Sequence, residues 1–263
     1  MHKKNTIDDT LLFARFLGME SRKIIKEKMT QGFSCELKQD GTFVTDIDFA
    51  VEDHLRRIIK KRFPDHDIIG EEYGSSPTGS PMRWVVDPID GTHSFRHKVP
   101  LFGTLITLLN ENEPVVGLID LPMLDRCYYG AKNCGVFMND LPVIIEDLNI
   151  GGSVDLEIIA TGDRLQFENV NMQEYFDIIY KSHKRVRTYT DCFGHAMAIE
   201  GSVGAMIDVD LKLWDVAATM LLVKEAGGII LDIPPCTDDG NGPYNIIFGK
   251  PGVVRWVASV LNI

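Results

Sequence analysis

The chain has 263 residues, of which 44% are hydrophobic and 25% charged, which is typical of a globular protein with a sizeable core. Its formal net charge of −11 disfavours a nucleic-acid backbone or an anionic membrane surface as the main partner, because like charges repel. The N-terminal residues 1–5 are followed by acids rather than by the apolar run of a secretory signal, and no apolar stretch approaches the roughly 20 residues that span a bilayer. A cytoplasmic location is therefore expected.

The five cysteines give no sign of a disulfide framework or a structural zinc site. Their number is odd and none forms a Cys-x-x-Cys pair, so idle thiols are the simpler interpretation. They stand at positions Cys35, Cys127, Cys134, Cys192 and Cys236.

Two helices are expected at the start of the chain. Apolar residues at helical spacing predict an amphipathic first helix, namely Leu12, Phe16, Leu17, Ile24 and Ile25. Asp48 is a plausible N-cap for a second helix, which should stop at Phe63-Pro64.

Strands are expected from Ile68 to about Phe137. The clearest are the apolar runs Arg83–Val86, Leu101–Leu109 and Val115–Ile119, with Asn110–Glu113 as a hairpin turn between the last two. The two helices and these strands suggest an N-terminal α+β part, residues 1–145.

The second half alternates strands and helices, which predicts a C-terminal α/β part, residues 146–263. The expected strands are Leu156–Ala160, Val186–Thr188 and Ala205–Val209. The expected helices are Met172–Tyr180, Cys192–Glu200 and Trp214–Ala226, the last closed by Gly227-Gly228.

Three acidic motifs carry the candidate chemistry. Gly70-Glu71-Glu72 is weak alone, because adjacent glutamates are usually solvated. In Trp84 to Thr92, Pro88 should kink the strand and direct Asp87, Asp90 and the Ile89 carbonyl to one point, a set of oxygens that hard cations accept. Gly91 and Thr92 should then open a turn or helix whose free N–H groups can hold a phosphate.

The third motif is Trp214-Asp215. Asp215 stands at the start of a predicted helix, where a carboxylate is also a normal cap. The acids form a site only if the fold brings them together, and spacing alone leaves the capping interpretation open.

These segments together resemble the inositol monophosphatase superfamily. The likeness runs over nearly the whole chain and includes Lys38, Val44–Asp48, Gly70–Glu72, Asp87–Thr92, Trp214-Asp215 and Glu225–Gly228. It implies a layered αβαβα sandwich, usually a homodimer, with two or three Mg²⁺ ions between the two parts.

The resemblance also implies roles for individual residues. The metal ligands would be Glu71, Asp87, the Ile89 carbonyl, Asp90 and Asp215. The catalytic residues would be Asp48 and Thr92, which orient or activate the attacking water, together with Glu71. The amides of Gly91 and Thr92 would bind the phosphate, and Lys38 would lie near the metal.

Metal-activated water would then hydrolyse a small phosphate monoester without a side-chain nucleophile. Other phosphatase chemistries fit poorly. Asp87 and Asp90 are one residue too far apart for the D-x-D-G-T motif of haloacid dehalogenases, and Asn133 stands where a cysteine phosphatase based on Cys127 needs arginine.

The substrate side resembles the histidinol-phosphatase branch in Pro100–Ile106 and Asp191–Gly194. Asp191 and Asp208 fall at substrate-facing positions, and two carboxylates would suit a leaving group that carries an amine and an imidazole. L-Histidinol phosphate is therefore the expected substrate. Asp191 could instead cap the helix that follows it.

Alternatives remain open. Inositol monophosphate or a range of sugar phosphates could be the substrate, and the cluster Lys181, His183, Lys184, Arg185 and Arg187 is either a solvated edge or a site for a second phosphate. A non-catalytic homologue that binds metal or ligand is disfavoured, since Asp48, Glu71, Asp87, Asp90, Thr92 and Asp215 are all present. His93 is interpreted as a residue near the metal site or at the rim of the cleft rather than as a metal ligand. His195 is interpreted as a helix residue whose hydrogen bonds are satisfied locally.

Overall fold

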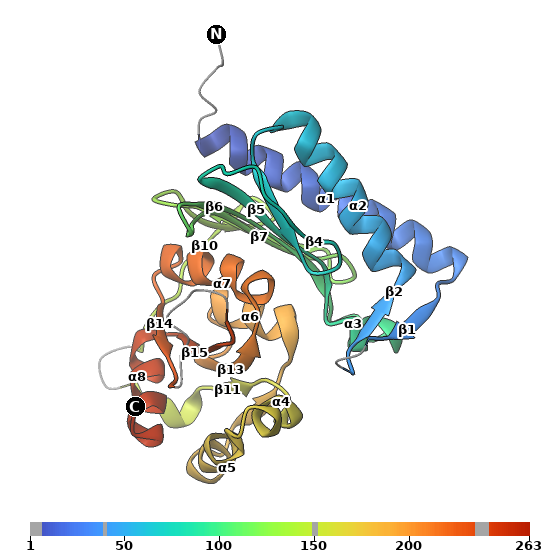
Figure 1. The fold of residues 1–263 in the computed structure, drawn as a ribbon. Helices are drawn as coiled ribbons and strands as arrows, with labels where there is room; N and C mark the ends of the chain where they lie inside the picture. Colours follow the sequence, from blue (N-terminus) through green and yellow to red (C-terminus); the bar gives the residue numbers. More distant parts are fainter. Residues whose placement is uncertain (1–6, 39–40, 149–151, 235–241) are drawn as a thin grey trace.

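The computed structural model describes residues 7–38, 41–148, 152–234 and 242–263. Its elements stack in layers, with helices α1 (Ile7–Gln31) and α2 (Asp46–Arg62) over one face of a large sheet (Figure 1). Helices α6 (Asp191–Ile199) and α7 (Leu213–Glu225) separate this sheet from a smaller one. The far side is covered by α4 (Arg164–Asn169), α5 (Gln173–Ser182) and α8 (Pro251–Leu261). The predicted αβαβα sandwich is confirmed.

Helix α1 exists as predicted, but its predicted apolar face is only partly buried: Leu17 and Ile25 are fully buried. Leu12 and Phe16 are 60% and 44% exposed, whereas small residues face the sheet. At Gly18, a Cβ atom would lie only 3.1 Å from Leu118. The helix therefore packs closely on the sheet through a strip of mainly small residues, Ala14, Leu17, Gly18 and Ser21. A hydrophobicity pattern gives small residues little weight and therefore defines the buried face only in part.

Helix α2 begins earlier than expected. Its N-cap is Thr45, and Asp48 is the third helical residue, whose carboxylate accepts the Thr45 backbone N–H in a capping box. The expectation that Asp48 is the N-cap was therefore wrong by three positions. The helix ends at Arg62, with Phe63 as C-cap, as predicted.

The large sheet has eight strands in the order β10-β9-β8-β7-β6-β5-β3-β4. Neighbours are antiparallel except β3 and β5. The predicted hairpin joins β6 to β7, with Glu111 and Asn112 at positive φ in its turn. In chain order the strands are β3 (Asp67–Gly70), β4 (Gly74–Ser76), β5 (Met82–Asp90), β6 (Gly103–Asn110), β7 (Glu113–Leu121), β8 (Arg126–Ala131), β9 (Gly135–Met138) and β10 (Leu141–Val143). A separate antiparallel pair is formed by β1 (Cys35–Leu37) and β2 (Phe43–Thr45).

The small sheet has the order β12-β11-β13-β15-β14. The strand expected at Leu156 starts only at Ile159, because Ser153 caps a helical turn, Val154–Leu156, just before it. The three helices predicted in this half are confirmed to within two residues at each end, whereas α4, α8, β14 and β15 were not predicted. Its strands are β11 (Ile159–Thr161), β12 (Val186–Thr188), β13 (Ala205–Leu211), β14 (Ile229–Asp232) and β15 (Tyr244–Gly249).

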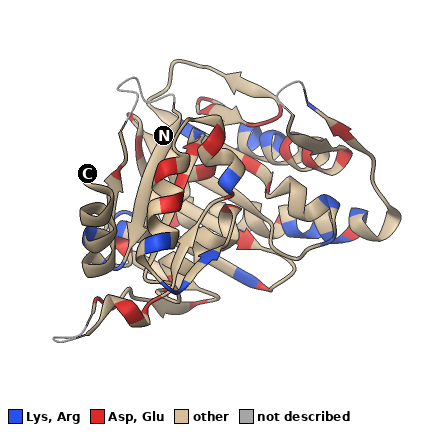
Figure 2. Ribbon diagram, turned by 90° about the horizontal axis from the view of Figure 1, so that it is seen from below, with Lys and Arg blue, Asp and Glu red and all other residues tan. Residues whose placement is uncertain are grey.

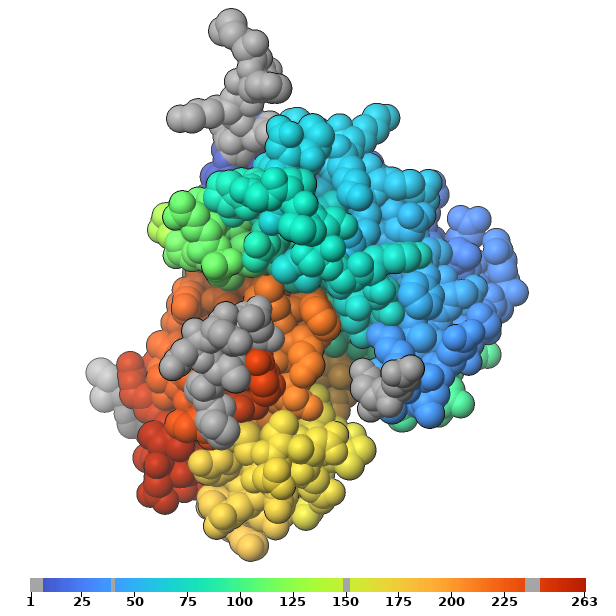
Figure 3. Space-filling model, in the orientation of Figure 1, coloured from blue at the N-terminus to red at the C-terminus, as the bar shows by residue number. Residues whose placement is uncertain are grey.

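The two sheets share one buried layer. A single core cluster contains Leu105 and Ile119 of the large sheet, Leu222 of α7 and Phe248 of the small sheet. The space-filling view shows the two halves of the chain in broad contact (Figure 3). The division at residue 145 stays a prediction; it falls between the two sheets, but the hydrophobic core is continuous across it.

Across the described ranges, no helix combines the length and the apolar character needed to cross a membrane. Cys35, Cys127, Cys134 and Cys192 are free thiols, and Cys236 lies outside the described residues.

Candidate active site

A proline bulge in β5 sets the geometry of the site. Asp87 pairs with Leu105 of β6 and Asp90 with Gly103, so one extra residue is inserted in β5. The Pro88 carbonyl accepts a hydrogen bond from the Thr104 hydroxyl at 2.8 Å, and Thr104 in turn lies 2.6 Å from the Ser21 hydroxyl of α1. The predicted kink at Pro88 is therefore present, and a buried chain of hydroxyl groups satisfies its free carbonyl.

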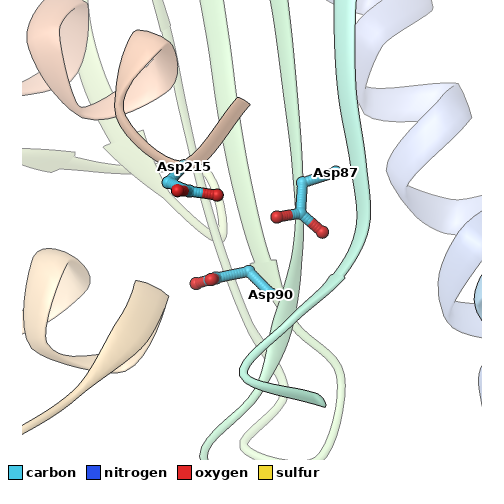
Figure 4. A group of neighbouring side chains, drawn as sticks. All are labelled: Asp87, Asp90 and Asp215. Carbon is cyan, nitrogen blue, oxygen red and sulfur yellow. The ribbon is translucent and has the colours of Figure 1, made fainter. Parts of the chain in front are cut away.

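Acidic residues occur throughout the molecule (Figure 2), but three of them converge here. One carboxylate oxygen from each of Asp87, Asp90 and Asp215 lies within 4.8 Å of the other two. Asp87 and Asp90 come from β5 and Asp215 from α7, and their carboxylates point toward a common space (Figure 4). Residues more than 120 positions apart in the chain thus meet between the large sheet and α7.

Asp215 fulfils both interpretations of its position. It is the third residue of α7, and its Oδ2 accepts the Lys212 backbone N–H at 2.7 Å, which caps the helix. Its carboxylate also belongs to the group of three. The capping role therefore orients Asp215 toward Asp87 and Asp90 rather than competing with that contact.

The electrostatics of this group are unfavourable without a cation. Burial, followed by the charges of Glu71, Asp90 and Asp215, raises the pKa of Asp87 well above its ordinary value. Burial and neighbouring carboxylates, Asp191 first among them, likewise raise the pKa of Asp90. The pKa of Asp215 is raised to about 8 by burial and then by the charge of Glu71.

Glu71 lies beside the three carboxylates and interacts with them electrostatically. Its side chain pairs with Lys38 at 2.8 Å, and Lys38 also contacts Glu72 at 2.7 Å. Burial opposes the charge on Lys38, but these two glutamates raise its pKa. Lys38 is thus the counter-ion of the Glu71 turn, while the role of Glu71 as a ligand stays a prediction.

Asp48 and Thr92 are also brought together. The Thr92 hydroxyl lies 3.4 Å from Asp48 Oδ1 and 2.9 Å from the Ile89 carbonyl. Burial raises the pKa of Asp48 to about 6, against hydrogen bonds from the Thr45 hydroxyl and N–H. This carboxylate can therefore exchange a proton near neutral pH.

Gly91 occupies a position that other residues would not tolerate. It has φ +83° and precedes the short helix α3 (Thr92–Arg96), and a Cβ there would lie 3.1 Å from the Leu101 carbonyl. The same Cβ position is 3.2 Å from Asp191 Oδ2, so the predicted phosphate-binding turn adjoins the predicted substrate residue.

Asp191 adjoins the acidic group and does not act as the helix N-cap. The N-cap of α6 is Thr190, whose hydroxyl donates to Asp191 Oδ2 at 2.8 Å. Next in the chain, the Cys192 N–H donates to Asp90, which links α6 to the bulge. Burial raises the pKa of Asp191 to about 6.

Asp208 has a different environment. Its carboxylate is 1% exposed and accepts hydrogen bonds from His195 at 3.1 Å and from the Val209 N–H at 3.0 Å. Its role as a substrate-facing acid stays a prediction, and this burial weighs against it. His195 lies in a helix and both its ring nitrogens are hydrogen-bonded, as expected, but the partners Thr219 and Asp208 lie on other elements and are not local.

The sequence did not reveal how the Glu71 turn is held. Glu52 of α2 is fully buried and accepts the N–H groups of Glu72 and Tyr73 at 2.7 and 3.2 Å, and it pairs with Arg56 at 2.7 Å. A Cβ at Gly70 would lie 2.0 Å from its carboxylate. The sequence signal that could have revealed this support is the pair Glu52 and Arg56, which stand four residues apart on the apolar face of α2.

The other candidate features differ in their exposure. His93 is exposed, as are Lys181, Lys184, Arg185 and Arg187, whereas His183 is buried and bonds to the Glu157 carbonyl. A pocket of about 600 Å³ lies between α1 and β8, lined by residues such as Arg15, Lys23 and Tyr129 and by none of the acids above.

The chain is similar in sequence and in fold to known proteins. A histidinol-phosphatase of Chlorobaculum parvum is 34% identical over 213 residues, which cover 81% of this chain and 78% of that protein. An inositol monophosphatase of Dictyostelium discoideum is 30% identical over 251 residues, 90% of this chain and 89% of that protein. The solved structure of an inositol monophosphatase from Zymomonas mobilis, 24% identical, has the same fold, with a TM-score of 0.83 over 99% of this chain and 100% of that one. The model of the Inositol monophosphatase family matches residues 8–254, and the chain belongs to this family.

Proposed function

We propose that this member of a phosphatase family hydrolyses L-histidinol phosphate to L-histidinol with Mg²⁺ and water. The observation that carries the proposal is the convergence of Asp87, Asp90 and Asp215 next to a further carboxylate, Asp191. We further propose two or three Mg²⁺ ions and a homodimeric assembly, as the family resemblance implies.

The residues of the site fit a divalent cation. Asp87 Oδ1 is buried and has no hydrogen-bond partner among the described residues, which is costly for a carboxylate oxygen unless a cation meets it. Three mutually repelling carboxylates supply hard oxygen ligands, the type that Mg²⁺ prefers. Glu71 and the Ile89 carbonyl would complete the set of protein ligands.

When bound, Mg²⁺ lowers the pKa of water and neutralises charge on the phosphate and the leaving group. The side chains around it would orient the reactants. Thr92 can pass a proton from the attacking water to Asp48, which lies 3.4 Å from the Thr92 hydroxyl and titrates near neutral pH. The N–H groups of Gly91 and Thr92 would hold the phosphate next to the acids.

Asp191 supports a cationic leaving group. It is held beside Gly91, so a phosphate bound there places the leaving group near its carboxylate. An ammonium or imidazolium group would form a charge-assisted hydrogen bond with it, which a sugar hydroxyl cannot match. A histidinol-phosphatase and an inositol monophosphatase match this chain at similar identity. Inositol monophosphate or a range of sugar phosphates is therefore the competing substrate assignment.

The test is phosphate release from a substrate panel in Mg²⁺. The panel holds L-histidinol phosphate, inositol 1-phosphate, fructose 1,6-bisphosphate, adenosine bisphosphate and p-nitrophenyl phosphate. The proposal predicts the highest kcat/KM for L-histidinol phosphate, and a higher value for an inositol or sugar phosphate would contradict it. No turnover of any substrate would favour a non-catalytic homologue.

Asp191→Asn provides the residue-level test. We expect it to lower kcat/KM for L-histidinol phosphate by about 100-fold and that for p-nitrophenyl phosphate by about threefold or less, as the loss of a charged hydrogen bond predicts. Asp155→Asn, an exposed aspartate in the same half of the chain, is the matched control. Equal losses for both substrates would rule out recognition of a cation by Asp191.

A further inference from the structure

A buried histidine joins the elements that carry the substrate and metal residues. His195 of α6 is 1% exposed, and its ring packs edge-on against Phe248 of β15 with centroids 4.9 Å apart. Nδ1 lies 2.8 Å from the hydroxyl of Thr219 on α7, and Nε2 lies 3.1 Å from Asp208 on β13. Both ring nitrogens therefore bond to neighbouring elements rather than to groups of α6.

The helical spacing relates these contacts to the active site. His195 follows Asp191 by four residues on α6, and Thr219 follows Asp215 by four residues on α7. On α7, Asp215 and Thr219 therefore lie on the same helix face, one turn apart. On α6, Asp191 is the first residue and has a left-handed backbone with φ +57°, and the regular helical turn that follows it carries His195. The His195–Thr219 hydrogen bond thus joins the two helices four residues after the substrate carboxylate and the metal carboxylate.

Asp208 completes the arrangement. Gly162 leaves room for its carboxylate, since a Cβ there would lie 2.3 Å from Asp208 Oδ1. Asp208 is oriented by the Val209 N–H and by His195, so it anchors the imidazole to β13. An imidazole fixed at both nitrogens has one orientation, and this restricts sliding of α6 along α7.

We infer that His195 is a positioning residue for substrate recognition, which fixes Asp191 relative to Asp215 through its hydrogen bonds to Thr219 and Asp208. The inference rests on the proposed function, because it assumes that Asp191 contacts the leaving group. His195 itself touches neither substrate nor metal in this account. A small shift of α6 would move Asp191 away from the leaving group and leave Asp87 on β5 and Asp215 on α7 in place, while Asp90 is linked to α6 by the Cys192 N–H.

Three variants separate the two hydrogen bonds. Thr219→Val removes the link to α7 and leaves Asp208 paired with His195. His195→Phe removes both bonds but keeps an aromatic ring against Phe248. His195→Gln is the conservative variant, because its amide can donate to Asp208 and accept from Thr219.

The readouts are steady-state kinetics with two substrates, calorimetric binding of L-histidinol in the presence of phosphate and Mg²⁺, and the melting temperature. For Thr219→Val we expect KM for L-histidinol phosphate to rise about fivefold to tenfold and kcat to fall by less than about twofold, since ground-state recognition is lost. L-Histidinol binding should weaken by a similar factor. KM for p-nitrophenyl phosphate should change less, and His195→Gln should lie closer to the native protein than His195→Phe.

Two results would overturn the inference. One is an equal loss for both substrates together with a lower melting temperature, which indicates a purely structural role. The other is an unchanged KM and unchanged L-histidinol binding in Thr219→Val, which keeps the Asp208 pair and remains informative if His195→Phe fails to fold.

Asp191→Asn, measured in parallel, separates this failure from failure of the proposed function. If Asp191→Asn discriminates between the substrates and Thr219→Val does not, only the inference about His195 fails. If Asp191→Asn does not discriminate either, the proposed substrate and the inference fail together.

Discussion

Two regions of this protein contain buried carboxylates with different hydrogen-bonding surroundings: one holds Asp208, and the other holds Asp87 with Asp90 and Asp215. Asp208 is almost fully buried, and its oxygens are satisfied by His195 and by a backbone N–H. Asp87 is equally buried and faces Asp90 and Asp215, and within the part of the chain that the structure describes one of its oxygens has no hydrogen-bond partner. Burial alone therefore does not identify a metal site. An unsatisfied acid next to other acids is a stronger indication, because a bound cation offsets both the desolvation cost and the repulsion while the carboxylates stay ionised.

The largest expected effect follows from removing one acid of the unsatisfied set. Asp90→Asn should lower kcat/KM by about 1000-fold, because a neutral amide is a poor ligand for Mg²⁺ and Asp90 interacts with both Asp215 and Asp191. Folding should be retained, since one of three repelling charges is gone. Phosphate release and circular dichroism check this, and near-native turnover would remove Asp90 from the metal site.

The free energy of unfolding in the absence of metal should distinguish Asp208 from the carboxylates of the metal site. Asp208→Asn should lower the free energy of unfolding by about 1–3 kcal/mol, because it weakens a buried hydrogen-bonded pair. Asp87→Asn should leave it unchanged or raise it, because it relieves repulsion among the acids. Urea unfolding with a chelator present measures both variants. Destabilisation of the same size at Asp87 would indicate that this carboxylate already has a partner.

The pH dependence of metal-free stability offers a further comparison. A carboxyl group whose pKa is raised in the folded state holds a proton that the unfolded state releases, so stability falls as pH rises. For Asp215, with a folded pKa of about 8, that fall should extend from about pH 4 to pH 8. Mg²⁺ should therefore raise the melting temperature more at pH 8 than at pH 5. A shift independent of pH would show that these acids do not bind the ion.

The smallest expected effect concerns the support of the bulge. Thr104→Val removes the hydroxyl that binds the Pro88 carbonyl, at an expected cost of about 1–2 kcal/mol in stability and about tenfold in kcat/KM through a shift of Asp87 and Asp90. Thr107→Val, a buried threonine of the same strand that pairs with Val85 and Gly117, is the control. Equal effects of the two substitutions would mean that the hydroxyl chain does not position the bulge.

The sequence was most informative where a local signal determines local geometry. Pro88 between two acids predicted the kink, and Gly227-Gly228 marked the end of α7. It was less informative where tertiary contacts decide. The buried face of α1 depends on how closely Gly18 approaches Leu118, which no periodicity of large apolar residues reveals.

The candidate site shows the same limit. Asp87 and Asp90 are close in sequence, but their meeting with Asp215 depends on α7 packing between two sheets. The residues that hold the site, Glu52 for the Glu71 turn and Thr104 for the bulge, act through backbone groups and carry no motif. Asp208 could not be told from Asp191 by sequence, because the difference between them lies in a hydrogen bond to His195.

Calorimetric titration of Mg²⁺ into chelator-treated protein tests the metal site most directly. We predict saturable binding in the native protein and in Asp208→Asn, and its loss in Asp87→Asn. No binding in the native protein, or equal binding in both variants, would contradict a cation site built by Asp87, Asp90 and Asp215.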